Sequence, residues 1–160
     1  MCGINGIFHL NYKKVDQNQL IKMRDVLEHR GPDDAGFFID NVIGLGHRRL
    51  SIIDTSSNGH QPFISGDGRY AIVFNGEIYN YQSFYPELKA KGIELKTASD
   101  TEVLLKLFEL YGMEMLHRLN GMFAFAIWDK LEKKLTLCRD RMGVKPLYYC
   151  IHQNTLYFAS

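Results

Sequence analysis

The chain has 160 residues, of which 46% are hydrophobic and 23% charged, and its formal net charge is +1. This balance gives no reason to expect nucleic acid or an anionic membrane as a partner, and no apolar run reaches the length of a transmembrane helix. The cysteines, Cys2, Cys138 and Cys150, form neither an even disulfide framework nor a C-x-x-C pair, so we predict one domain in a reducing, cytoplasmic setting.

The first third of the chain predicts strands around a single helix. Apolar residues alternate with others over residues 2–10, which predicts a strand that begins almost at the first residue. Residues 16–31 predict a helix, because Asp16 can cap it and an apolar stripe lines one face. Residues 35–46 then predict a hairpin, and residues 48–54 predict a further strand.

The middle of the chain predicts two more helices. A turn-rich loop over residues 57–62 precedes a predicted strand at residues 69–75. Residues 80–92 predict a helix that Pro86 kinks or shortens. The helix predicted at residues 99–112 has a polar cap, an inward apolar stripe and a closing glycine.

Four strand-like runs complete the chain, at residues 121–129, 134–140, 147–151 and 155–160. Many strands with a few separated helices predict an α+β fold in which antiparallel sheet dominates. The run at 121–129 carries apolar groups on both faces, which indicates one sheet packed on another with helices outside.

Polar and glycine residues gather in three stretches, residues 29–36, 46–52 and 74–80. Each stretch alone has a structural explanation: a helix stop, a solvated or phosphate-binding arginine patch, and an Asn-Gly turn. The six histidines lack the spacing typical of metal ligands, so we predict no metal. Together, however, the three stretches supply groups that thiol chemistry requires.

Cys2 directly follows the initiator methionine. Taken alone, it is typical of a small buried hydrophobe at the start of a strand. A small residue at this position also lets the methionine be trimmed, and Cys2 then carries a thiol and an α-amino group that titrates near ~8. Such an amine can serve as the base that activates the thiol.

Groups that could bind and polarise an amide follow along the chain. Asn75 offers an amide donor at a strand end, and Gly76 offers a backbone N–H that a substrate can approach closely. Arg49 offers a planar fork for a carboxylate, and Asp100 offers a partner for an ammonium group. A substrate with an α-carboxylate, an α-ammonium and a side-chain amide is glutamine or asparagine.

The motifs MCGI, HRGPDDAG, GHRRLSIID, NGHQP, NGEIYNY, SDTEVLL, GMFAFAIWD and RDRMGVKPLYY occur in order along the chain. In these motifs the chain resembles the glutaminase domain of glutamine-hydrolysing asparagine synthetases, which are class II glutamine amidotransferases with an N-terminal nucleophile. The resemblance runs from Cys2 to Ser160. It implies the fold of the N-terminal-nucleophile hydrolases, a four-layer αββα sandwich of two antiparallel sheets flanked by helices.

The resemblance also implies roles for individual residues. Cys2 matches the nucleophile, and Asn75 and Gly76 match the oxyanion hole that stabilises the charge developing on the amide oxygen. The residues that match the binding site for the amino-acid head of glutamine are Arg49, Ile52, Asn75, Gly76, Glu77 and Asp100. We expect Cys138 and Cys150 to be core residues, inert because they are buried.

In the family, an ATP-using synthetase domain follows the glutaminase domain. Its serine- and glycine-rich pyrophosphate loop does not occur in these 160 residues. We therefore expect a glutaminase domain over residues 1–160 that needs no cofactor, and ATP and Mg²⁺ in a C-terminal domain that amidates aspartate. A homodimer is left open.

Three other functions would use some of the same residues. The ammonia acceptor could belong to surface-polysaccharide or secondary-metabolite biosynthesis. An amide hydrolase acting alone on another substrate is disfavoured, because an amide without an amino-acid head would not match both Arg49 and Asp100. A non-catalytic domain of the same fold would tolerate the loss of Cys2, which this chain retains.

Overall fold

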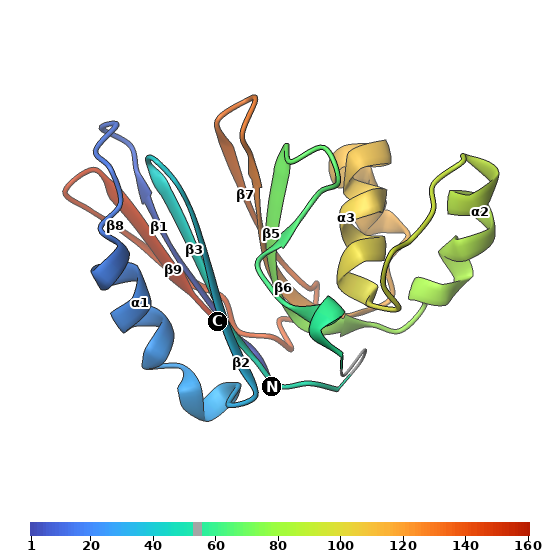
Figure 1. Ribbon diagram of the computed structural model, residues 1–160, viewed down its shortest axis with the longest axis horizontal. Coiled ribbons are helices and arrows are strands. Elements are labelled where there is room, and N and C mark those ends of the chain that lie inside the picture. The colour runs from blue at the N-terminus through green and yellow to red at the C-terminus, as the bar shows by residue number, and fades with distance from the viewer. Residues whose placement is uncertain (53–55) are drawn as a thin grey trace.

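The computed structural model describes residues 1–52 and 56–160 (Figure 1). Two antiparallel sheets pack face to face, with helix α1 on the outer face of one sheet and helices α3 and α2 beyond the outer face of the other. The predicted α+β fold, a four-layer αββα sandwich, is confirmed. No helix in the described part of the chain is long and apolar enough to cross a membrane.

The first sheet has five strands in the order β2-β3-β1-β9-β8. Their bounds are β1 Gly3–His9, β2 Asp34–Asp40, β3 Ile43–Arg49, β8 Tyr148–His152 and β9 Thr155–Ala159. The N-terminal strand β1 lies in the middle of this sheet, paired with β3 on one side and β9 on the other. Gly3 pairs with Arg48, so the pairing starts one residue after Cys2 and fixes where that residue lies.

The second sheet has four strands in the order β4-β5-β6-β7. Their bounds are β4 Phe63–Ile64, β5 Tyr70–Ile78, β6 Gly121–Asp129 and β7 Lys134–Arg139. Strand β6 pairs with β5 along its whole length, whereas β4 pairs only with Ile72 and Ala71. Among the residues that the structure describes, no strand therefore covers one edge of the second half of β5.

The first helix, α1 (Gln17–Asp25), begins where the sequence predicts and ends earlier. Asp16 caps it, since its Oδ1 accepts hydrogen bonds from the amides of Asn18 at 2.8 Å and Gln19 at 3.2 Å. The rest of the predicted helix forms a separate 3-10 turn, η1 (Glu28–Arg30). The other 3-10 turns are η2 Ser57–Gly59, η3 Tyr81–Phe84 and η4 Gly112–His117.

The helix predicted at residues 80–92 is shorter than expected, because the chain forms η3 before it enters α2 (Tyr85–Ala90). Pro86 lies in the first turn of α2, where its missing N–H would have no intrahelical acceptor. Helix α3 (Asp100–Tyr111) agrees with the prediction within one residue at each end. Ser99 caps it, and its Oγ accepts a hydrogen bond from the Thr101 amide at 3.1 Å.

Two expectations about strands are wrong. Residues 48–54 do not form a separate strand, because Arg48 and Arg49 still pair within β3 and residues 50–52 have no regular secondary structure. Residues 53–55 lie outside the described part. Asn75 and Gly76 do not end a strand, since β5 pairs with β6 through Ile78.

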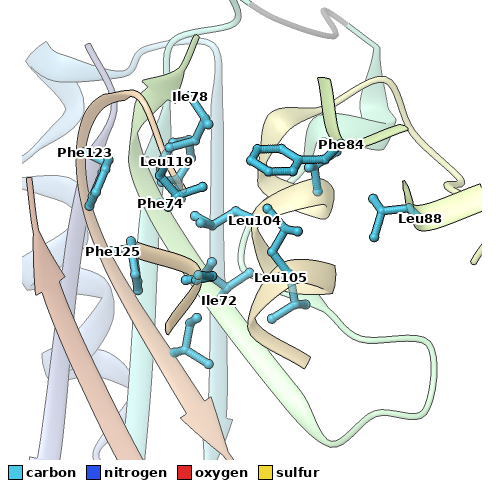
Figure 2. Close-up of a cluster of buried hydrophobic side chains, with 14 residues drawn as sticks. Ile72, Phe74, Ile78, Phe84, Leu88, Leu104, Leu105, Leu119, Phe123 and Phe125 are labelled. Carbon is cyan, nitrogen blue, oxygen red and sulfur yellow. The ribbon is translucent and has the colours of Figure 1, made fainter. Parts of the chain in front are cut away.

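Two layers of core hold the sandwich together. Between the sheets, the small side chains Ala71, Ala124 and Ala126 let the backbones approach closely around the buried Trp128. Between the second sheet and its helices, Leu104 and Leu105 of α3 point toward the aromatic and aliphatic residues of β5 and β6 (Figure 2). The outer helices thus bury the face of the sheet that does not meet the other sheet.

The second core layer gives a test of stability. Leu104 is 1% exposed and Leu110, on the same helix, is 37% exposed. Replacing Leu104 by Ala should lower the free energy of unfolding by about 2–5 kcal/mol, because it leaves a cavity as well as removing apolar contacts. The same change at Leu110 should cost less than about 1 kcal/mol. Urea unfolding of both variants measures the difference, and equal losses would contradict the packing.

Candidate active site

A cavity of about 310 Å³ lies at one end of the sandwich. It is lined by every residue that the sequence assigned to the site: Cys2, Arg49, Ile52, Asn75, Gly76, Glu77 and Asp100. These residues come from the start of β1, the end of β3 and the segment after it, the second half of β5, and the start of α3. The fold therefore brings four separate segments together at the predicted place.

The Cys2 thiol is held against the backbone that follows β3. Its Sγ lies 3.6 Å from the carbonyl oxygen of Leu50 and accepts a hydrogen bond from the Leu50 amide at 3.4 Å. Burial raises the pKa of the thiol above its ordinary value, although the Leu50 amide, the positive N-terminus and Arg49 oppose the rise. The resting thiol is therefore protonated at neutral pH and needs a base before it can attack.

The polar stretch at residues 29–36 fixes the backbone of the same cysteine. Arg30 Nε donates a hydrogen bond to the carbonyl oxygen of Cys2 at 3.2 Å. A Cβ atom at Gly31 would come within 2.4 Å of the Arg48 carbonyl oxygen, so only glycine permits this close approach. The stretch thus ends a helical segment and also holds the start of β1.

The open edge of β5 is completed by side chains instead of a strand. The amide of Phe74 donates to Gln61 Oε1 at 2.7 Å, and the carbonyl oxygen of Phe74 lies 3.2 Å from His47 Nε2. Four residues further along β5, the amide of Ile78 donates a hydrogen bond to Asp100 Oδ2 at 3.0 Å. These side chains take the place that a longer β4 would occupy.

Gly76 lies between Phe74 and Ile78 on this edge. Backbone groups alternate sides along a strand, so the Gly76 amide points to the same side as theirs, away from β6. Its partner in the register, Phe123, confirms this, because both backbone groups of Phe123 bond to Asp140 on the other side of β6. Among residues 1–52 and 56–160, no acceptor takes the Gly76 N–H, which faces the cavity.

Asn75 supplies a second donor beside that amide. Its side chain is buried, and Nδ2 donates one hydrogen to Ser160 Oγ at 2.8 Å, which leaves a second hydrogen on the same nitrogen. At Gly76 a Cβ atom would lie 2.4 Å from the Met122 carbonyl oxygen, so a side chain there would push β5 away from β6. Asn75 and Gly76 therefore place two N–H donors in the wall of the cavity that Cys2 also lines.

Opposite charges flank the donors. Asp100 is the first residue of α3 and is 4% exposed. Burial raises the pKa of its carboxyl group to about 6, and the nearby charge of Glu77 contributes to this rise. Arg49 is 6% exposed, and its Nη1 donates to the carbonyl oxygen of Ser56 at 2.9 Å. The cavity thus offers a cation and an anion fixed on different elements.

The solvated-patch explanation of residues 47–49 is wrong, because none of the three side chains is largely exposed. His47 and Arg49 face the other sheet, and burial lowers the pKa of His47 to about 4, so its imidazole is neutral. Arg48, which points to the opposite face, lies 3.2 Å from Asp25 Oδ1. The alternation of β3 separates the three side chains.

The sequence assigned no role to two further residues of the cavity, Gln61 and Lys145. Gln61 Nε2 donates to Thr101 Oγ1 at 3.2 Å, so this side chain links the open edge of β5 to the start of α3. Gln61 lies in the NGHQP motif, which was the signal available for it. Lys145 is buried, which is unusual for lysine.

The expectation for the other cysteines holds for one of them. Cys138 on β7 is partly buried, and burial raises the pKa of its thiol to about 11, which suppresses its reactivity. Cys150 is not a core residue, because β8 is the edge strand of the first sheet and leaves this thiol exposed.

Comparisons with known proteins agree with this geometry. The family model described as a glutamine amidotransferase domain matches residues 1–160. Asparagine synthetase [glutamine-hydrolyzing] 1 of Bacillus subtilis is 50% identical over 163 residues, which cover 100% of this chain and 26% of that protein. Putative asparagine synthetase [glutamine-hydrolyzing] 2 of Methanocaldococcus jannaschii is 45% identical over 179 residues, with 100% of this chain and 34% of that protein covered.

Among solved structures, the glutamine phosphoribosylpyrophosphate amidotransferase of B. subtilis superposes with a TM-score of 0.81. The match covers 99% of this chain and 41% of that chain, and the sequences are 24% identical. This likeness supports the fold, and the sequence matches support the family. The chain belongs to the glutamine amidotransferase domain family.

Proposed function

We propose that this chain hydrolyses glutamine to glutamate and ammonia with Cys2 as the nucleophile. The observation that carries the proposal is the Cys2 thiol in one cavity with the Asn75 amide and the Gly76 N–H, which no protein acceptor takes among the described residues. Two N–H donors in the same cavity as a nucleophile can stabilise the oxyanion that forms when an amide is attacked.

The charges of the cavity support an amino-acid substrate. The guanidinium of Arg49 can bind an α-carboxylate through two parallel hydrogen bonds, and the carboxylate of Asp100 can pair with an α-ammonium. Ile52 and Glu77, which also line the cavity, would complete the binding of the head group. The amide at the far end of glutamine would then reach Cys2.

The reaction follows from these assignments. After removal of Met1, the α-amino group of Cys2 takes the thiol proton, directly or through a water molecule, and the thiolate adds to the amide carbon. The oxyanion is held by Asn75 and Gly76 until the C–N bond breaks and the α-ammonium protonates the departing ammonia. Water then cleaves the γ-glutamyl thioester, which releases glutamate and restores the thiol. These steps use no metal or cofactor.

We further propose that the ammonia serves a synthetase domain of a longer protein, which uses ATP and Mg²⁺ to amidate aspartate to asparagine. The names of the relatives support this acceptor over the other acceptors considered, and the chain spans about a quarter of the length of the B. subtilis relative. The cysteines of the described chain form no disulfide, which supports a reducing, cytoplasmic setting. A homodimer stays a prediction.

A blocked N-terminus tests the proposed base. An uncleaved N-terminal extension should abolish glutamine hydrolysis and leave the fold intact, because an amide-bound Cys2 nitrogen cannot accept a proton. Ammonia release and thermal unfolding should be measured on the same fusion before and after a protease exposes Cys2. Full turnover by an extended protein of verified mass would rule out the self-activated mechanism.

If Asn75 stabilises the oxyanion, its replacement should affect kcat and leave KM nearly unchanged. Asn75→Ala should lower kcat by about 10²–10³-fold with little change in KM, because the donor acts on a charge that develops only in the transition state. Ser160→Ala is the matched control, since it removes the partner of Asn75 and keeps the amide. The decrease in kcat should be smaller in Ser160→Ala than in Asn75→Ala. A defect of Asn75→Ala that appears only in KM would make this residue a binding group instead.

The raised pKa of Asp100 predicts how glutamine binding depends on pH. Since burial raises this pKa to about 6, the carboxyl group gains a proton and loses its charge as the pH falls through that value. The KM for glutamine should therefore rise below pH ~6, when an ammonium loses its anionic partner. Asp100→Asn should raise KM at neutral pH and remove this dependence. A wild-type KM that is constant between pH ~5 and ~7.5 would contradict the assignment.

A further inference from the structure

Lys145 is a buried lysine in the wall of the cavity. Only 3% of it is exposed, and it lines the cavity together with Met1 and Cys2. Its backbone is fixed by the loop after β7, since its amide donates to Asp140 Oδ2 at 2.9 Å and its carbonyl oxygen accepts from Arg139 Nε at 2.8 Å. The side chain therefore starts from a rigid position and extends toward the N-terminus.

The ammonium group of Lys145 contacts the side chain of Met1. Its Nζ lies 2.7 Å from Met1 Sδ. A thioether sulfur is a weak acceptor, and a buried charge without a strong partner is costly. If Met1 is removed, as the proposed function requires, the space beside this ammonium opens next to the new α-amino group of Cys2.

From this contact we propose that Lys145 is a positioning residue that acts on Cys2 through its charge. In the trimmed chain its ammonium disfavours a second positive charge on the Cys2 α-amino group and favours the ionised form of the Cys2 thiol. The proposal rests on the proposed glutaminase function, in which that amine is the base and that thiolate is the nucleophile. Both effects increase the fraction of protein molecules in which Cys2 is ready to react at neutral pH.

Other charged groups face the same region. Burial and the guanidinium of Arg30 lower the pKa of Lys145, whereas the charges of Cys2, Glu77 and Asp140 oppose that lowering. The negative charges of Glu77 and Asp140 favour the charged form of Lys145. Arg49 and Asp100 also act on the Cys2 thiol, with opposite signs.

The positive charge of Lys145 lowers the pKa of the Cys2 α-amino group and that of the Cys2 thiol. A charge within about 4–6 Å shifts a neighbouring pKa by roughly 1–3 units. Without Lys145, the α-ammonium should lose its proton at higher pH, and so should the thiol. The acidic limb of the kcat profile should therefore move upward by about one pH unit, which is about a tenfold loss of kcat on that limb and little loss above it.

The test compares Lys145→Met with wild type over pH ~5.5 to ~9.5 at saturating glutamine, where a change of KM with pH does not alter the rate. Lys145→Arg should restore most of the wild-type profile, and Lys145→Gln should repeat the shift. Lys106→Met is the charge-matched control, because Lys106 pairs with Glu109 on α3 and does not line the cavity. A purely structural role would lower kcat by the same factor at every pH, and such parallel profiles would overturn the proposal.

A second measurement does not depend on turnover. The rate at which iodoacetamide alkylates Cys2 in the trimmed protein, followed by peptide mass spectrometry, reports the ionisation of this thiol. Its pH midpoint should rise by about one unit in Lys145→Met and Lys145→Gln and stay unchanged in Lys106→Met. An unchanged midpoint in both Lys145 variants would overturn the proposal. Absence of glutamine hydrolysis by wild type would instead contradict the proposed function, and alkylation would still test Lys145.

Discussion

The active site depends on an edge of strand β5 that no other strand covers within residues 1–52 and 56–160. Because β4 has only two residues, the amides in the second half of β5 would be unpaired. Gln61 and Asp100 accept two of these hydrogen bonds, at Phe74 and Ile78, and the Gly76 amide between them faces the cavity. An amide held in a strand by neighbours on both sides cannot turn away, so this donor is oriented before a substrate arrives.

The position of β1 imposes a second constraint. An N-terminal strand in the middle of a sheet places the first residues of the chain among fixed neighbours, here the Leu50 backbone and Arg30. The same burial raises the pKa of the Cys2 thiol. A precisely placed nucleophile is thus also a protonated one, and the site needs a nearby base and a favourable local charge. The α-amino group and Lys145 would meet these two needs.

Local patterns predicted the elements whose stability is decided locally. Helix α3 agreed within one residue, because Ser99 caps it and its apolar stripe has helical spacing. Residues 48–54 were assigned to a separate strand because alternation alone cannot show where pairing with neighbours ends. Burial of Cys150 was also predicted wrongly, since the composition of β8 does not reveal that the strand lies at the edge of its sheet.

The residues of the candidate site also differ in whether the sequence alone predicts them. Cys2, Arg49 and Asp100 could be chosen from the sequence, because their chemistry and the motifs around them point to one reaction. The contributions of Gln61 and Lys145 could not, because they depend on contacts between distant segments. Gln61 meets Thr101, 40 residues away, and Lys145 meets Met1, 144 residues away. Only the folded chain brings these groups together.

The most direct test is a crystal structure of the trimmed protein after reaction with a diazoketone analogue of glutamine. The thiolate displaces N₂ from the protonated diazo carbon and forms a thioether, so one methylene separates Cys2 Sγ from the ketone. We expect the ketone oxygen to occupy the place of the oxyanion. The ketone oxygen should lie about 2.7–3.1 Å from both the Gly76 nitrogen and Asn75 Nδ2. A ketone oxygen directed elsewhere, with the Gly76 amide bonded to a protein atom, would contradict the role of the open β5 edge.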